Sequence, residues 1–262
     1  MNVKAKKSLG QNFLKAKWAL ILMTKAAKVG KKDIILEAGP GKGALTEKLL
    51  EAGAKVIAVE KDRRLIPELE KKFSKEIKSG RLRIIEGDIL NFNPANYGLQ
   101  TINYKLISNI PYYITGSFLE KFLSAEIQPE KMVLTVQKEV AKRITASSGK
   151  ESVLSISVKA YGKPEYIKAV GKEFFSPKPK VDSAIILIDN ISKERFGKSD
   201  EKLFFKIMKT GFSHKRKFLL GNLKGKEFEA DEKLFKNLGI NPKARAEDLT
   251  LGKWLALAKS LE

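Results

Sequence analysis

The most constraining feature of the sequence is an alternation of short apolar runs with helical segments that begins at Asp33. Five runs in this alternation indicate strands, at 34–36, 55–60, 82–88, 104–109 and 131–137, and two further strands are expected at 166–170 and 184–188. Between them, segments such as 44–52 and 64–73 carry apolar residues at helical spacing. Strands separated by helices indicate a parallel sheet covered on both faces, so we predict a doubly wound α/β fold.

The alternation stops at a polar linker near residues 189–200, after which only helical segments follow. These segments are 201–212, 215–223, 231–237 and 251–261. We therefore predict a Rossmann-like domain over residues 1–190 and a small all-helical domain over residues 191–262. The first domain opens with a basic N-terminal segment that includes an expected helix over residues 13–29.

The large excess of basic over acidic residues indicates a nucleic-acid partner. Lys and Arg number 51 against 30 for Asp and Glu, which gives a net charge of +21, and an extended phosphate backbone is the natural counter-charge. The absence of Cys and the single His, His214, argue against disulfides, thiolate chemistry and His-rich metal sites, so no metal is expected. No apolar stretch approaches the roughly 20 residues that span a bilayer, and no signal peptide is visible. We expect a cytoplasmic, monomeric protein.

A glycine-rich turn, residues 37–43, lies between the first expected strand and the helix that follows it. Gly39 and Gly41 would allow a tight turn and a close approach of ligand to backbone. The spacing is neither that of a dinucleotide-binding fingerprint nor that of a P-loop. Taken alone, such a turn can equally be structural.

Three acids end the first three strands, and the carboxyl ends of parallel strands face one crevice. Glu60 could accept hydrogen bonds from both hydroxyls of a ribose, and Asp88 from an adenine amine. Glu37 would lie near an amino group of the ligand. Each could also be a solvated strand end. Together, without a pyrophosphate-binding spacing, they favour S-adenosylmethionine as the ligand.

The sharpest local motif is Asn-Ile-Pro-Tyr-Tyr at residues 109–113, directly after the fourth strand. Adenine N6 is a poor nucleophile, so a catalyst must aim its lone pair at the methyl group rather than remove a proton first. The Asn109 amide oxygen and a peptide carbonyl at Ile110 or Pro111 could accept its two hydrogens, and Tyr112 could stack on the base. A core-packed turn at the end of a strand is the alternative.

Two further segments carry candidate RNA contacts. The Pro-stiffened loop 174–183 offers Phe175 as a second stacking face, with Lys178 and Lys180 directed at phosphate; a rigid connection with solvated lysines is the alternative. Between residues 202 and 226 the chain has eight basic residues and no acid. Within it lies the basic cluster, which we predict to contact the RNA backbone and which comprises Lys215, Arg216 and Lys217.

With these motifs in view, the chain resembles the ribosomal RNA adenine N6,N6-dimethylase family. The resemblance covers essentially the whole chain and rests on blocks at 7–14, 37–43, 109–113, 137–141, 175–183 and 245–249. It implies a class I methyltransferase sheet that ends in an antiparallel strand. It also implies that the target adenine is held by residues 109–112 and Phe175, and that S-adenosylmethionine is contacted by Asn12, Leu14, Gly39, Glu60, Asp88 and Asn109.

The substrate implied by the resemblance is a pair of adjacent adenines in the hairpin loop near the 3′ end of small-subunit (16S) rRNA. Each adenine would receive two methyl groups within a nearly mature subunit during ribosome biogenesis. Antibiotic-resistance methylases of the large subunit share the blocks at 109–112 and 175–179, but residues 10–13 and 245–249 favour the small-subunit enzymes. A non-enzymatic assembly factor with the same fold is the other alternative, and the intact Asn109, Tyr112 and Glu60 argue against it.

Overall fold

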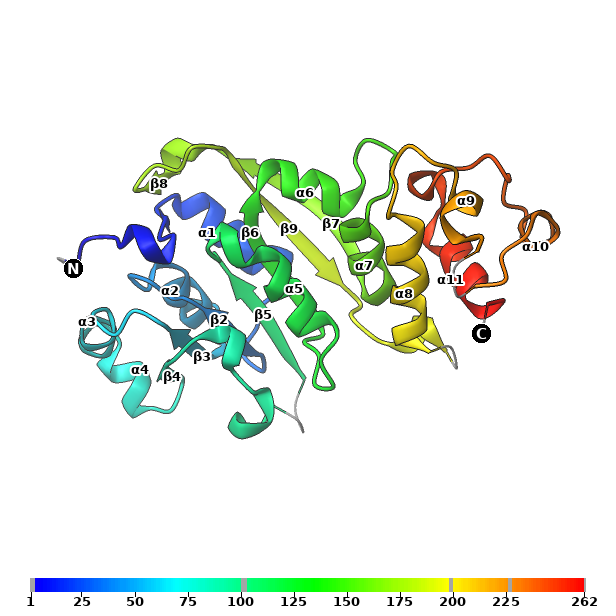
Figure 1. Ribbon diagram of the computed structural model, residues 1–262. Coiled ribbons are helices and arrows are strands. Elements are labelled where there is room, and N and C mark those ends of the chain that lie inside the picture. The colour runs from blue at the N-terminus through cyan, green and yellow to red at the C-terminus, as the bar shows by residue number, and fades with distance from the viewer. Residues whose placement is uncertain (1–2, 100–102, 198–199, 226–227, 262) are drawn as a thin grey trace. The chain divides into compact units, whose positions relative to one another are not determined.

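The computed structural model describes residues 3–99, 103–197, 200–225 and 228–261, and the chain divides into two compact units (Figure 1). Unit 1 comprises Met1–Ala141 and Lys163–Ile191, and unit 2 comprises Lys142–Gly162 and Ser192–Glu262. The expected boundary at 190/191 lies one residue from the junction at 191/192. Residues 142–162, expected in the first domain, instead group with the C-terminal helices, because Tyr161 packs on Phe196 and Phe205.

Unit 1 is built on a seven-stranded sheet of order β4-β3-β2-β5-β6-β9-β7. The strands are β2 (Ile34–Ala38), β3 (Lys55–Glu60), β4 (Leu82–Glu86), β5 (Tyr104–Ser108), β6 (Lys131–Gln137), β7 (Lys163–Val170) and β9 (Ser183–Asp189). Strands β2 to β6 are parallel, and β9 runs antiparallel to both β6 and β7. All five residues of the central β5 are buried, as expected for a strand with helices on both faces.

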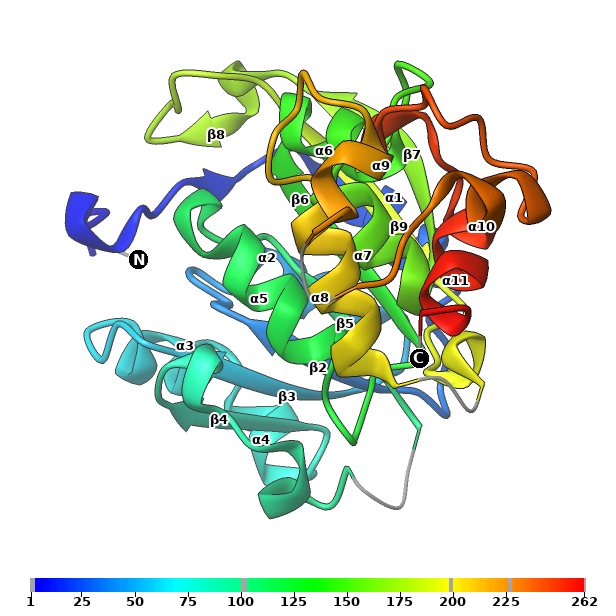
Figure 2. The ribbon, with the colours of Figure 1, turned by 45° about the vertical axis from the view of Figure 1, so that its right-hand side comes forward.

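The helices of unit 1 cover both faces of this sheet. On one face, buried residues of α1 (Lys17–Ala26) and α2 (Ala44–Glu51) share a core with β2 and β3, and α5 (Thr115–Leu123) lies on the other face (Figure 2). The segment expected as one helix over 64–73 forms α3 (Ile66–Lys72), followed by α4 (Ser74–Lys78). The junction between the units at 141/142 lies within α6 (Lys138–Thr145).

The N-terminal segment differs from the helix expected over residues 13–29. Helix α1 begins only at Lys17, because Phe13 and Leu14 form a short strand, β1 (Phe13–Leu14), that pairs antiparallel with β8 (Phe175–Ser176). The partner strand comes from the Pro-stiffened loop more than 150 residues later in the chain, so helical spacing alone could not reveal it.

Unit 2 is helical, as its sequence pattern indicates. Its helices are α7 (Val153–Tyr161), α8 (Glu201–Gly211), α9 (Leu219–Leu223), α10 (Glu232–Asn237) and α11 (Leu251–Lys259). Trp254 is fully buried and stacks on Phe212. The helix expected over 215–223 begins only at Leu219, which leaves the basic cluster in the preceding turn. Among the described residues, no helix combines the length and apolar character needed to cross a membrane.

Candidate active site

A cavity of about 450 Å³ lies at the carboxyl ends of β2, β3 and β5. Its walls come from residues 9–15, 37–42, 44–45, 59–61, 87–89 and 109–114, together with Leu20 and Ser176. This is the edge at which open parallel sheets bind ligands, and the volume suits a small organic molecule. The three predicted acids and the Asn109 motif therefore meet around one space.

The glycine-rich turn lines this cavity and requires glycine for two separate reasons. Gly39 and Gly41 have φ angles of 65° and 59°, a conformation that side chains other than glycine rarely adopt. A Cβ atom on Gly41 would also lie 2.9 Å from the ring of Phe13, which packs against the turn and also lines the cavity. The turn therefore brings bare backbone against the cavity.

Glu60 ends β3 with a buried carboxylate held by two backbone donors. The Gly41 N–H donates to Oε2 at 3.0 Å and the Asp62 N–H donates to Oε1 at 2.8 Å. Burial raises the pKa of Glu60, and these backbone hydrogen bonds oppose the rise. Each oxygen keeps a further lone pair, so the carboxylate can accept from two neighbouring hydroxyls.

Asp88 follows β4 and stands at the edge of the cavity. Its Oδ1 accepts from the Leu90 N–H at 3.0 Å, and its Oδ2 forms a 2.7 Å ion pair with Lys61. Burial favours a higher pKa for Asp88, but the hydrogen bonds from Lys61 and Leu90 outweigh it and the pKa is lowered. The group is thus a fixed carboxylate acceptor.

Glu37, the third acid, has the opposite character. Its side chain is only 1% exposed, and its Oε2 accepts a hydrogen bond from the Thr46 hydroxyl at 2.7 Å. Burial raises the pKa of Glu37 from 4.5 to about 8, so the free protein carries a neutral carboxylic acid here at pH 7. This protonation was not expected from the sequence.

Asn109 is anchored by a main-chain acceptor from the N-terminal segment. Its Nδ2 donates to the carbonyl oxygen of Asn12 at 2.9 Å. With the NH₂ end of the amide engaged in this way, Oδ1 is the end left to accept hydrogen bonds at the cavity. Ser108 fixes the end of the preceding strand by donating to the Ala38 carbonyl at 2.5 Å. Ile110, Pro111 and Tyr112 line the same cavity.

Tyr112 is held by a hydroxyl–hydroxyl contact of 2.6 Å with Ser183, a fully buried residue of β9. Burial raises the pKa of Tyr112, so the phenol stays neutral at pH 7. The neighbouring Tyr113 is 63% exposed and also lines the cavity. A contact between Tyr112 and a β9 residue could not be anticipated from the local motif.

The N-terminal segment supplies one wall, on which the resemblance placed Asn12 and Leu14. Both line the cavity. Three further lining residues were not expected from the sequence: Gln11 and Phe13 in this segment, and Lys61 just after β3. The signal that could have indicated Gln11 and Phe13 is their position on either side of Asn12.

Phe175 is not brought to the cavity. Its side chain is 4% exposed and belongs to the hydrophobic core, because the β1–β8 pairing sets it opposite Leu14, and Ser176 reaches the cavity instead. A stacking face must be accessible, so the structure as described offers no such face at this residue. Lys178 and Lys180 of the same loop are exposed.

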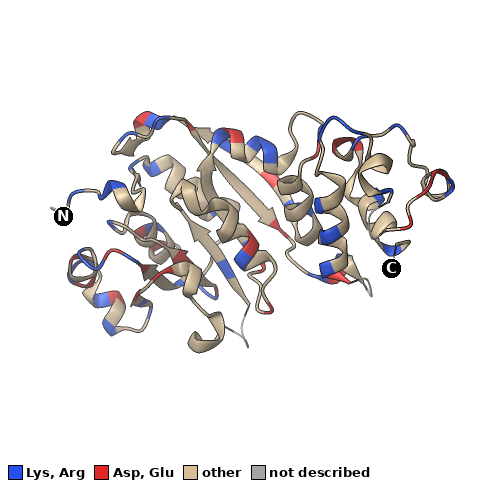
Figure 3. Cartoon of the chain, viewed as in Figure 1, with Lys and Arg blue, Asp and Glu red and all other residues tan. Residues whose placement is uncertain are grey.

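The basic cluster lies in unit 2, in the exposed turn between α8 and α9 (Figure 3). Arg216 and Lys217 line a shallow groove of about 700 Å³ together with Lys224, Lys243 and the half-exposed ring of Phe218. Cationic side chains around an exposed aromatic ring suit a nucleic-acid strand. Across the described part of the chain, no group of three or more His, Asp or Glu is placed to hold a metal ion.

Comparison with known proteins places this geometry in context. Residues 2–262 match the family model described as Ribosomal RNA adenine dimethylase. A protein called Ribosomal RNA small subunit methyltransferase A from Dehalococcoides mccartyi (strain CBDB1) is 41% identical over 97% of this chain and 88% of its own length. A protein of the same name from Fusobacterium nucleatum is 38% identical over 100% of this chain and 99% of its own.

Two solved structures share the fold. A dimethyladenosine transferase from Plasmodium falciparum, 27% identical, superposes with a TM-score of 0.77 over 94% of this chain and 95% of its own. The 23S rRNA methyltransferase ErmE, 24% identical, superposes with a TM-score of 0.78 over 95% of this chain and 99% of its own. The full-length match, with the cavity and the Asn109 motif in place, shows that the chain belongs to the ribosomal RNA adenine dimethylase family.

Proposed function

We propose that this protein transfers methyl groups from S-adenosylmethionine to N6 of two adjacent adenines in the 3′-terminal hairpin loop of small-subunit (16S) rRNA, two to each adenine. The family match and the names of the similar proteins support the reaction and the RNA. The observation that carries the proposal in this chain is the Asn109 amide, which is anchored through Nδ2 and keeps Oδ1 for a substrate amine.

The cavity residues fit S-adenosylmethionine, whose contribution when bound is an electrophilic methyl group on a sulfonium. Glu60 offers two acceptor oxygens for a ribose diol, and Asp88 offers a fixed carboxylate for an adenine amine. Gly39 and Gly41 let the ligand lie against bare backbone. Glu37 can ionise when an ammonium group arrives, because a nearby cation lowers a carboxyl pKa.

The chain's own residues act on the substrate amine by positioning it. The Asn109 Oδ1 and a carbonyl of residue 110 or 111 accept the two N6 hydrogens, so that the lone pair points at the methyl carbon. The amine nitrogen forms the new N–C bond as the bond between the methyl carbon and the donor sulfur breaks, with its electron pair left on sulfur, and the surplus proton of the amine leaves to solvent. A monomethylated amine keeps one N6 hydrogen, which one of these two acceptors can still hold during a second transfer. Tyr112 supplies a ring held in place by Ser183.

The RNA contacts belong to the same proposal. The basic cluster, Lys178 and Lys180 are exposed cations that bind phosphate, and the net charge of +21 favours a polyanionic partner. We expect a monomer that needs no metal and acts on a nearly mature small subunit where subunits assemble. A stacking role for Phe175 stays a prediction, because the side chain is buried.

The test is methylation of purified small subunits that lack the modification. Mass spectrometry of the digested RNA should show dimethyladenosine, and primer extension should stop at the 3′-terminal hairpin. A stop in large-subunit RNA instead would indicate the antibiotic-resistance type of enzyme. Subunit binding without S-adenosylmethionine binding in titration calorimetry would indicate a non-enzymatic factor.

A further inference from the structure

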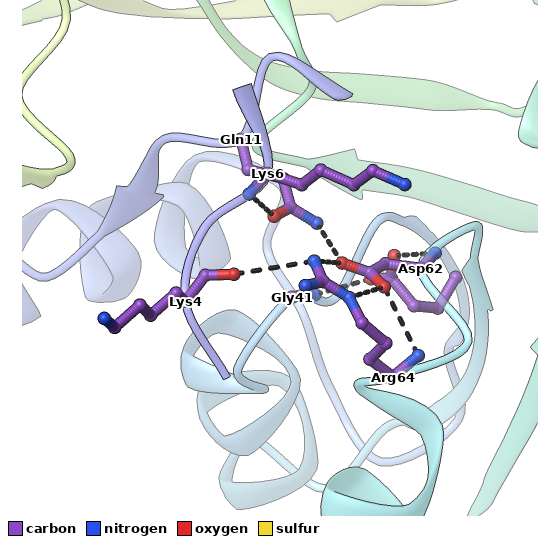
Figure 4. Close-up of polar contacts among 7 residues, drawn as sticks. Lys4, Lys6, Gln11, Gly41, Asp62 and Arg64 are labelled. Atoms are coloured by element: carbon purple, nitrogen blue, oxygen red, sulfur yellow. Dashed lines mark hydrogen bonds and ion pairs between the residues drawn. The ribbon is translucent and has the colours of Figure 1, made fainter. Parts of the chain in front are cut away.

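Asp62 is a buried carboxylate that the methyl-transfer chemistry does not use. Its side chain is 4% exposed and lies in the turn just after β3. Arg64 donates from Nε to Oδ1 at 2.8 Å and from Nη2 to Oδ2 at 2.6 Å, and Gln11 donates from Nε2 to Oδ2 at 2.9 Å. Figure 4 shows Gln11 and Arg64 reaching Asp62 from two different segments of the chain.

The same group of contacts fixes the backbone of the N-terminal segment. The Lys6 N–H donates to Oε1 of Gln11 at 2.7 Å, and Nη2 of Arg64 lies 3.5 Å from the Lys4 carbonyl (Figure 4). The Gln11 amide thus uses one end on the segment itself and the other on Asp62. With the Asp62 carboxylate held by Arg64, the segment has a defined docking point on the turn after β3.

One residue further on, the segment reaches the catalytic motif. The carbonyl of Asn12 accepts the Nδ2 hydrogen of Asn109, and the Asn12 side chain donates back to the Gly10 carbonyl at 3.2 Å. Beyond it, β1 contributes only two residue pairs with β8, which is too little to hold the upstream half of the segment. The docking at Asp62 therefore holds the chain on the upstream side of the Asn12 carbonyl, while the pairing of β1 with β8 holds it on the downstream side.

We propose that Asp62 is a positioning residue that docks residues 4–12 through Gln11 and thereby sets the Asn12 carbonyl that orients the Asn109 amide. The positioning role of Asp62 rests on the proposed function of Asn109. The docking of residues 4–12 at Asp62 does not depend on that function. Asp62 also donates from its N–H to Glu60, and this backbone contact survives any change of the side chain. Side-chain variants therefore separate docking of the segment from support of Glu60.

The sharpest perturbation is Gln11→Glu, which keeps the shape and the acceptor for Lys6 but sets a carboxylate against Asp62. Losing a hydrogen bond to a charged group should speed amide hydrogen exchange in residues 4–12 and weaken S-adenosylmethionine binding, each by about tenfold or more. The single-turnover methylation rate should fall by a similar factor, with the RNA KM unchanged. Ser8→Glu adds the same charge to an exposed residue of the segment and should behave as wild type.

The double variant Gln11→Glu/Asp62→Asn keeps the wild-type net charge and replaces the pair of carboxylates by a hydrogen bond from the new amide at position 62 to the new carboxylate at position 11. It loses one contact with Arg64, because Oδ2 of Asp62 accepts from Arg64 Nη2 as well as from Gln11. It should therefore recover part of the lost exchange protection, cofactor affinity and rate. The proposal is wrong if Gln11→Glu leaves exchange and affinity unchanged, or if the double variant is no better than the single one. Hydrogen exchange and cofactor affinity are measured without RNA, so they test the docking alone. If the proposed rRNA substrate is wrong, the wild-type protein itself will show no methylation of that RNA.

Discussion

Replacing Glu37 by Gln should stabilise the protein at neutral pH. The carboxyl is 1% exposed, and its pKa is about 8 because burial, reinforced by the nearby Glu60 carboxylate, disfavours the charged form. Glutamine keeps an acceptor for the Thr46 hydroxyl, which lies 2.7 Å from Oε2, and nearly the same volume. It cannot ionise, so it avoids the cost that wild type meets as the pH rises.

The expected size follows from the two pKa values. A carboxyl whose folded-state pKa is raised contributes stability that is fully present below its ordinary pKa of 4.5 and is lost as the pH rises through 8. Each pH unit of the interval is worth about 1.4 kcal/mol. Wild type should therefore lose on the order of 3 kcal/mol relative to Glu37→Gln by pH 7, and on the order of 5 kcal/mol above pH 8.

Urea unfolding between pH 4 and pH 8.5 measures this difference. Trp18 lies in unit 1 and Trp254 in unit 2, so a Trp254→Phe background makes fluorescence report on unit 1 alone. Glu47→Gln is the matched control: an ion pair with Lys72 lowers the pKa of Glu47, so this change should not stabilise the protein at neutral pH. A wild-type and Glu37→Gln difference that does not grow with pH would refute the reasoning.

Three further outcomes are expected. Asn109→Ala should abolish methyl transfer while unfolding and RNA binding stay close to wild type, and unchanged turnover in the methylation assay would remove the acceptor role given to its amide. Gly41→Ala should weaken S-adenosylmethionine binding by about tenfold or more in titration calorimetry, because it strains a positive φ and displaces the Phe13 ring; wild-type affinity would show that the turn can relax. Changing all three residues of the basic cluster to Gln should reduce the slope of log affinity against log salt by up to about 3, and a slope that does not move would place the RNA elsewhere.

The sheet was predictable where its signal is local. The five parallel strands were expected from short apolar runs, and β2 to β6 confirm them. The antiparallel direction of β9 came only from the family resemblance, because an apolar run does not encode the direction of its partner. The grouping of α7 with unit 2 depends on Tyr161 packing against aromatic side chains that lie 35 and 44 residues later.

In the site, too, residues that belong to local motifs were predictable and contacts between distant segments were not. Asn109, Glu60 and Gly41 were expected at the site, because the residue types and their spacing in each motif already indicate the chemistry. The anchors of these residues were not expected, because each joins distant parts of the chain: Asn12 and Asn109 are 97 residues apart, and Gln11 and Asp62 are 51 apart. The protonation of Glu37 also escaped prediction, since it depends on how completely the side chain is buried.

The N-terminal segment over residues 4–12 affects how preparations of this enzyme should be judged. Lys4, Lys6 and Lys7 are exposed, so contaminating trypsin-like proteases can trim the chain there while the seven-stranded sheet stays whole. Trimmed molecules would keep their circular dichroism and melting behaviour yet lack the backbone contacts of Lys4 and Lys6 with Arg64 and Gln11. Specific activity should therefore be normalised to intact mass, because spectroscopic measures of foldedness would count such molecules as competent.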